Sequence, residues 1–444
     1  MTKKNNFLFP ISLFIFYLLE IFLLQNKQFQ LGIFFYLLYV VLLYMNDKRN
    51  IIIFFVFHLP LLPVIPTDYK LFGLVGPHEI IYGSSFYVLY GMKKKFRNKS
   101  LNKYQKLSIK FIYFLFFIQM YVIIKDTVLG LNPKFTGVVY ILKNMIRYYL
   151  YYMSLIFLIQ IFYKEKLLNY VLSGVKYSVV FLVVSMLFTD YLISIGADIA
   201  GRKAYLSKEA FRSRFSGFYG AGGDQNSIGV FLASTLGFFM ALFEKSRSIK
   251  SYIIFIGFVV LGILLTGSRT AFLSTAIIFM VFLITNKSGS AKFYILISVV
   301  LFYFIFNKQL NLVFQRFLDP SAVAAIDPKS DGRIFKWIYY TEWLLDNPKT
   351  FIIGNQIRIP FKAAPHNFFI YIVYHTGIVI LFVFIRLFIK LLKIIKLKES
   401  KFSLKNIYYI LPIPFAIMTV NSFGSSIYLW IFLVVGAIYL PSKV

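Results

Sequence analysis

The residues of this chain best suited to chemistry are one histidine and two arginines, each placed near a boundary between polar and apolar sequence. His366 and Asn367 directly precede a long apolar run. Arg269 separates two apolar runs, and Arg333 lies in the polar stretch before His366. An imidazole titrates near neutral pH and can accept a proton from a hydroxyl, whereas a guanidinium binds phosphate oxygens in pairs. This combination predicts the transfer of a group away from a phosphate.

Two further arginines, Arg212 and Arg214, precede the glycines Gly220, Gly222 and Gly223. Glycine lets the backbone come close to a ligand, and the apolar run that follows predicts a helix whose positive end faces the same place. We expect at least one of the two arginines to bind phosphate, and the sequence does not distinguish between them. The alternative is an ordinary basic loop at a membrane edge.

Lys143 and Arg147 stand four residues apart inside an apolar run, so they share one face of a helix. Two like charges on one face of a membrane-spanning helix are unfavourable against lipid. We therefore expect them to line a water-filled cavity open to the outside, as part of a substrate-binding surface, or to pair with an acid. The alternative is that the helix starts later and both side chains lie at the membrane surface.

The other histidines predict structural roles. His375 lies about 2.5 helical turns beyond His366 in the same apolar run, and we expect it to be buried with its hydrogen bonds satisfied. His58 precedes a cluster of prolines, and His78 stands near the start of another apolar run.

Several kinds of chemistry are disfavoured by what the sequence lacks. It contains no cysteine, which excludes disulfides, thiol catalysis and thiolate-bound metals. It has no Asp-x-Asp pair or histidine-rich metal spacing, and no P-loop, Gly-x-Ser-x-Gly elbow or dinucleotide fingerprint. The sequence therefore predicts a site built from fixed cations, with no metal and no cofactor.

The segments that must position these residues are strongly apolar. Of the 444 residues, 59% are hydrophobic and 20% aromatic, and the mean hydropathy is +0.73. Apolar runs of about 20 residues span a bilayer as helices, and the runs here are continuous rather than alternating, unlike barrel strands. We predict an all-α, polytopic transmembrane helical bundle of about 14 spans that forms a single membrane domain over 1–444. The predicted spans cover 7–25, 29–45, 50–66, 71–92, 107–124, 138–162, 168–190, 226–243, 252–266, 270–285, 293–306, 366–389, 407–421 and 424–440.

The net charge of +31 could suggest nucleic-acid binding, but its distribution argues against this. Lys and Arg gather in alternate loops between the predicted spans, which is the pattern of cytoplasmic loops, and no nucleic-acid-binding motif accompanies them. With these loops inside, both termini are cytoplasmic. The bias toward Ile, Lys, Asn, Phe and Tyr indicates an AT-rich genome, so we expect a multi-pass protein of a bacterial plasma membrane.

Two long loops then face the extracytoplasmic side, 191–225 and 307–365. Connections of this length are usually functional. The second contains an amphipathic segment from Arg333 to Leu345 that predicts a helix lying on the membrane surface, and Asn347-Pro348 ends it. The candidate residues Arg212, Arg214, Arg269, Arg333 and His366 would all lie on this side.

Four short motifs follow one another between about residues 210 and 380. They are Leu265-Thr266-Gly267-Ser268-Arg269-Thr270-Ala271, then Arg333 with Trp337, then Asn347-Pro348 with Gly354, and finally Pro365-His366-Asn367-Phe368 with Gly377. In this order and on one side of the membrane, they resemble the O-antigen ligase and polymerase family, whose relatives include polymerases of capsular and other surface polysaccharides. Thr270 stands where many relatives carry glycine.

The resemblance implies a C-type membrane glycosyltransferase architecture and a reaction without metal or nucleotide sugar. The donor would be an oligosaccharide linked to a polyprenol through diphosphate, and His366, Arg269 and Arg333 would be catalytic. Arg212 or Arg214, with Lys143, Arg147 and Asn367, would contact the diphosphate or the glycan. Expected partners are this lipid-linked donor, the lipid bilayer, and a flippase and chain-length regulator.

Three functions fit this sequence. The first is a polymerase that joins lipid-linked repeat units into a capsule, O-antigen or similar surface glycan. The second is a ligase of the same class that transfers finished glycan to another acceptor. The third is a flippase or other transporter of lipid-linked oligosaccharide, which would have inverted repeats and a charged cavity reachable from both faces. No repeat is evident in the sequence.

Overall fold

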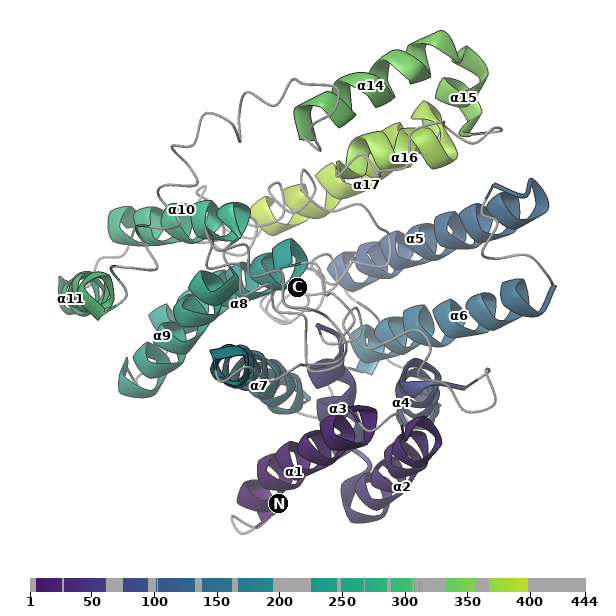
Figure 1. Cartoon of the computed structure of the whole chain (residues 1–444). Helices are drawn as coiled ribbons and strands as arrows, with labels where there is room; N and C mark the ends of the chain where they lie inside the picture. Colours follow the sequence, from purple (N-terminus) through teal and green to yellow (C-terminus); the bar gives the residue numbers. More distant parts are fainter. Residues whose placement is uncertain are drawn as a thin grey trace.

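The structure is a computed structural model of the whole chain. It describes residues 5–25, 28–60, 75–94, 101, 103–131, 138–161, 167–194, 225–245, 249–266, 268–285, 289–305, 307, 311, 333–355 and 367–397. Within these ranges the regular elements are all helices (Figure 1). The all-α prediction is therefore confirmed for the part of the chain that the structure describes.

The helices follow the apolar runs of the sequence closely. Their bounds are α1 Asn5–Gln25, α2 Phe29–Asp47, α3 Asn50–His58, α4 Pro77–Lys94, α5 Lys103–Val128, α6 Val138–Ile161, α7 Leu168–Ser194, α8 Gln225–Lys245, α9 Ile249–Thr266, α10 Arg269–Thr285, α11 Gly289–Ile305, α14 Arg333–Asp346, α15 Pro348–Ile353, α16 Phe368–Thr376 and α17 Ile378–Leu397. A helix satisfies its own backbone hydrogen bonds, which is the condition for a segment surrounded by hydrocarbon.

Three of the described helices are long and apolar enough to cross a membrane, by length and composition. They are Phe29–Asp47, Gln105–Val128 and Asn169–Leu187. Shorter apolar helices cover Phe9–Glu20, Ile228–Gly237, Ile253–Thr266 and Thr270–Thr285. Large apolar side chains such as Phe22, Phe117 and Phe304 are exposed on the outside of the bundle, as the lipid-facing side of a membrane helix would be.

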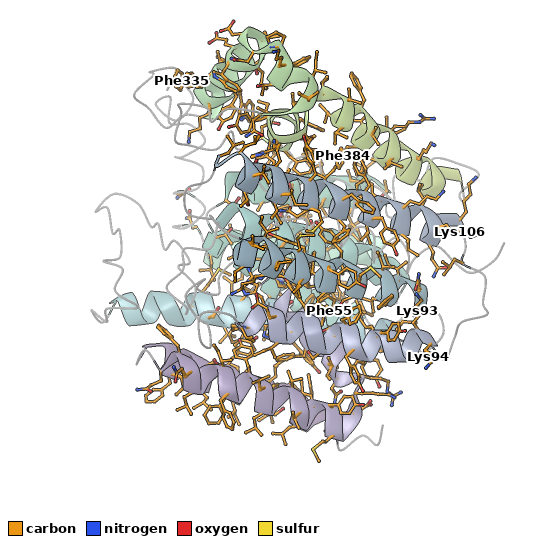
Figure 2. All side chains as sticks on the ribbon, turned by 90° about the vertical axis from the view of Figure 1, so that its right-hand side faces the viewer. Phe55, Lys93, Lys94, Lys106, Phe335 and Phe384 are labelled. Carbon is orange, nitrogen blue, oxygen red and sulfur yellow. The ribbon has the colours of Figure 1, made fainter. Side chains whose placement is uncertain are left out.

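The bundle has two distinct ends. Figure 2 shows Lys93, Lys94 and Lys106 together at one end and Phe335, near the start of α14, at the opposite end. Phe384 of α17 lies between them. We call these the lysine end and the far end. These lysines thus lie at the end opposite the start of α14, and the side of a membrane that each end faces stays a prediction.

Helices α5 and α6 run in opposite directions between these ends. Near the start of α5, Gln105 donates a hydrogen bond from Nε2 to the carbonyl oxygen of Ile159 near the end of α6, at 2.9 Å. Midway along, the rings of Phe116 and Tyr152 lie 5.8 Å apart. The end of α5 and the start of α6 are therefore both at the far end.

The predicted span 366–389 is wrong as a single helix. The structure divides it at Gly377 into α16 and α17, and the two fold back against each other (Figure 1). The rings of Phe368 and Phe384 lie 5.3 Å apart, although 16 residues of continuous helix would separate them by about 24 Å. The cause is Gly377, whose φ of 86° lies in a region that favours glycine and interrupts the helix.

Helix α14 covers the segment expected to form an amphipathic helix, and it lies against α16. Tyr374 packs against Tyr340 and Trp343, with ring centroids 5.4 and 5.7 Å apart. Asp346 ends α14 and Pro348 starts α15, because proline lacks the N–H that would continue the first helix but fits the first turn of the next. Figure 1 shows α14 and α15 lying beside α16 and α17.

Candidate functional site

The sequence-predicted site falls partly within the described residues. Arg212, Arg214 and His366 lie outside them. Arg269 is the first residue of α10, and Arg333 is the first residue of α14. The substrate-binding and catalytic roles of all these residues stay predictions. The structure does show how the helices that begin at or beside these residues pack against their neighbours.

The start of α10 is a tight polar turn packed against α8. Ser268 donates its N–H to Thr266 Oγ1 at 3.3 Å and accepts a weak hydrogen bond from the N–H of Ala271 at 3.4 Å, which caps the helix. A methyl group at Gly229 of α8 would lie 2.8 Å from the Cβ atoms of Ser268 and Ala271. Helix α8 begins at Gln225, so its start lies near the helix start that carries Arg269.

The start of α16 is capped by Asn367. Its side-chain oxygen accepts hydrogen bonds from the N–H groups of Phe369 at 3.0 Å and Ile370 at 3.3 Å. Asn367 is buried, because the fold at Gly377 brings this helix start back alongside α17. The predicted role of Asn367 was contact with substrate, and the structure shows that it also shapes the backbone directly after His366.

Arg269, Arg333 and Asn367 share one structural feature: each stands at the start of a helix. The first N–H groups of a helix have no partner within it, and the helix dipole adds partial positive charge there. Such positions favour anions. Packing contacts group α14 with α15 and α16, and α10 with α8 and α9. The structure therefore brings the Arg333 and Asn367 helices together, and places Arg269 in a second group with α8.

Arg147 pairs with an acid on a neighbouring helix. Its Nε donates to Oε1 of Glu79 in α4 at 2.8 Å, and its Nη2 donates to the same oxygen. The two side chains are only 21% and 14% exposed. The carboxylate also accepts a hydrogen bond from the N–H of Gly76 at 2.9 Å. Of the two expectations for Lys143 and Arg147, pairing with an acid describes Arg147, whose charge is compensated inside the protein.

A polar cluster that the sequence reasoning missed lies at the far end, where α5 meets α15 and α16. Lys125 donates hydrogen bonds from Nζ to Oδ1 of Asn355 and to the carbonyl oxygen of His375. The carboxylate of Asp126 lies 3.7 Å from Lys125 Nζ and 3.6 Å from His375 Nδ1. A signal was present in the sequence, because Lys125-Asp126 is a pair of charged residues at the end of an apolar run, where charges are costly.

The side chain of His375 is 14% exposed, so it is half-buried rather than fully buried as expected, and its hydrogen bonding is incomplete. Its Nδ1 has no hydrogen-bond partner among the described residues, and neither does Oδ1 of Asp126. Its ring packs against Tyr371, with centroids 4.2 Å apart. The described residues contain no group of three or more His, Asp or Glu side chains that could hold a metal ion.

Comparison of the chain with protein-family models, with curated proteins and with solved structures finds no match. The function is therefore argued from the residues and their geometry.

Proposed function

We propose that this protein is a polysaccharide polymerase that joins polyprenyl-diphosphate-linked oligosaccharide repeat units on the outer face of a bacterial plasma membrane. In this proposal the chain forms about 14 spans with both termini in the cytoplasm, and the far end faces outward. The observation that carries it is the position of Arg269, Arg333 and Asn367 at the starts of three helices. A diphosphate is the kind of group that such helix starts and guanidinium groups bind.

The proposed reaction has one bond formed and one bond broken. The oxygen of an acceptor sugar hydroxyl attacks the anomeric carbon of the donor, and the bond from that carbon to the diphosphate oxygen breaks. The leaving lipid diphosphate keeps the electron pair, and the hydroxyl proton goes to His366. Arg269 and Arg333 stabilise the negative charge that grows on the diphosphate, which lowers the barrier because the charge is largest in the transition state.

Other predicted site residues would assist the proposed base and the two arginines. Asn367 fixes the start of α16 directly after the proposed base. Arg212 or Arg214 would add a further cation, since they precede α8 in the sequence and α8 packs against the start of α10. Lys143 would contribute positive potential from α6, whereas the charge of Arg147 is compensated by Glu79. The cations belong to the protein, so the proposed reaction uses neither metal nor cofactor.

A transporter of lipid-linked oligosaccharide is the second candidate, and the α16–α17 region favours it. Broken helices with buried charges beside the break are typical of secondary transporters, and Gly377 breaks this pair next to Lys125, Asp126 and His375. A ligase would use the same chemistry as the polymerase and differ only in its acceptor.

The test is to reconstitute the purified protein in vesicles with a lipid-linked repeat unit, with and without a chelator. A polymerase yields a ladder of longer lipid-linked products, with Arg269→Ala and His366→Ala inactive although still inserted in the membrane. A ligase yields product only when a different acceptor is present. Substrate crossing the vesicle membrane without a new glycosidic bond would establish the transporter instead, and full activity of both variants would refute the proposed site.

A further inference from the structure

The segment from Asn355 to His375 contains Pro365, His366 and Asn367, and its two ends meet at the far end of the bundle. The backbone N–H of Asn355 donates to the carbonyl oxygen of Tyr374 at 2.6 Å. The chain thus leaves this point after α15 and returns to it at the end of α16. Because Asn367 caps the start of α16, whatever fixes α16 also fixes the position of Asn367.

One side chain from a third helix binds both ends. Lys125 of α5 donates from Nζ to the side-chain oxygen of Asn355 at one end and to the carbonyl oxygen of His375 at the other. Tyr121, one turn earlier on α5, donates from its hydroxyl to the carbonyl oxygen of Ile353 at 3.4 Å. The segment is therefore joined at its base to α5, the helix that also packs against α17 through Phe111 and Phe384, whose rings are 5.6 Å apart.

We propose that Lys125 is a positioning residue of the active site, a clamp that holds Asn355 and the carboxyl end of α16 together and so sets the place of Asn367, the residue that follows His366 in the sequence. This inference rests on the proposed function for its catalytic meaning. The clamp itself is a statement about three elements, α5, α15 and α16, and can be tested without any reaction.

The surroundings of Lys125 require a cationic hydrogen-bond donor at this position. Lys125 is only 9% exposed, and a buried ammonium must use its three donors on acceptors. Asn355 and His375 supply two oxygens, and the Asp126 carboxylate at 3.7 Å supplies the opposite charge. The His375 carbonyl belongs to the last turn of α16, where a cation also interacts favourably with the helix dipole. An apolar residue at this position would leave several buried acceptors without a donor.

The contact of Lys125 with the carboxyl end of α16 also restricts the position of the amino end of this helix. Helix α16 has nine residues and is therefore about 13 Å long. Lys125 binds at its carboxyl end, and Asn367 caps its amino end directly after His366. A small rotation about the carboxyl end displaces the amino end by more, and displacements of about 1 Å at a catalytic group can cost about 100-fold in rate.

The kinetic test compares Lys125→Met with Lys125→Arg and with Lys106→Met, an exposed lysine of the same helix at the lysine end. We expect Lys125→Met to lower kcat for glycan transfer roughly 10- to 100-fold with a much smaller change in donor KM. Lys125→Arg should restore part of this loss, because a guanidinium can also donate to two oxygens, and Lys106→Met should behave like the wild type. An unchanged kcat in Lys125→Met, or a loss confined to KM, overturns the positioning role.

The structural test is cross-linking, for which the absence of native cysteines provides a clean background. Tyr121→Cys and Ile353→Cys introduce thiols at exposed positions on α5 and α15, and a short bis-maleimide reports whether the two helices stay together. We expect a high yield with Lys125 present and a several-fold lower yield with Lys125→Met. An equal yield overturns the clamp whatever the activity shows.

The two tests separate failure of the clamp from failure of the proposed function. If the wild type forms no glycosidic bond, the proposed function fails, and the cross-linking yield still decides whether Lys125 holds the segment. Asn355→Ala removes one acceptor and keeps the buried cation, so it should give an intermediate cross-linking yield even if Lys125→Met does not fold. A wild-type cross-linking yield in Asn355→Ala would contradict the role assigned to the hydrogen bond between Lys125 and Asn355.

Discussion

Gly354 and Gly377 end two neighbouring helices and pack against each other's chain with no space for a side chain at either position. Both have positive φ, 87° and 86°. A methyl group at Gly354 would lie 2.8 Å from the backbone nitrogen of Thr376, and one at Gly377 would lie 2.8 Å from that of Ile353, with carbonyl groups closer still. This crossing brings the end of α15 to the end of α16 and creates the site at which Lys125 binds both.

Replacing either glycine by alanine should therefore destabilise the protein strongly. The backbone conformation alone costs about 1–3 kcal/mol for a residue with a side chain, and the methyl group would also overlap backbone atoms that cannot move independently. We expect Gly354→Ala and Gly377→Ala each to lower the midpoint of thermal unfolding in detergent and to reduce the Tyr121–Ile353 cross-linking yield.

Gly257 supplies the matched control. It lies within α9, and a methyl group there would meet nothing within 4 Å. Alanine is favoured over glycine inside a helix by about 1 kcal/mol, so Gly257→Ala should leave the midpoint unchanged or raise it. If Gly377→Ala were as stable as Gly257→Ala, the crossing described here would be incorrect.

The pair of Arg147 and Glu79 should contribute to stability as a unit. Removing one partner of a largely buried ion pair leaves the other charge uncompensated, which costs about 3 kcal/mol or more. We expect Arg147→Met and Glu79→Gln each to lower the unfolding midpoint, and the double variant to lie above the more damaged single variant. A double-mutant cycle measured by thermal unfolding in detergent gives the coupling, and additive effects would show that the pair does not act together.

The positions of most helices could be predicted from the sequence because long apolar runs permit little else in a membrane. The predicted spans 138–162 and 270–285 differ from α6 and α10 by one residue at one end. The fold between α16 and α17 could not be predicted this way. The run 366–389 is largely apolar on both sides of Gly377, so hydropathy does not distinguish one straight helix from two that fold back, and the conformation of Gly377 decides between them.

The candidate site was predictable where chemistry depends on residue type and was missed where it depends on contacts between distant residues. Arg269 attracts attention as a cation between two apolar runs and Arg333 as the first residue of an amphipathic segment; the structure places each at a helix start, while their roles in the reaction stay predictions. Lys125 and Asn355 are 230 residues apart, and no local pattern connects them. The partner of Arg147 was anticipated only as an acid, since nothing in the sequence selects Glu79 from the other carboxylates.

Asn367 has two roles, a structural one seen in the hydrogen bonds and a proposed one beside the substrate, and a single substitution separates them. Asn367→Asp keeps an oxygen that accepts from Phe369 and Ile370, and a negative charge is favourable at a helix start. Its unfolding midpoint should therefore remain close to that of the wild type. Asn367→Ala loses the cap and should be less stable by about 1 kcal/mol.

The activities of the same two variants should follow the opposite order to their stabilities if the diphosphate binds nearby. The carboxylate of Asn367→Asp would repel the donor, so glycan transfer should fall further than in Asn367→Ala, with the larger effect on donor KM. A neutral lipid-linked substrate analogue is the control, because it should not be repelled by the new carboxylate. If Asn367→Asp and the wild type transfer glycan from the charged donor equally well, the diphosphate binds away from the start of α16.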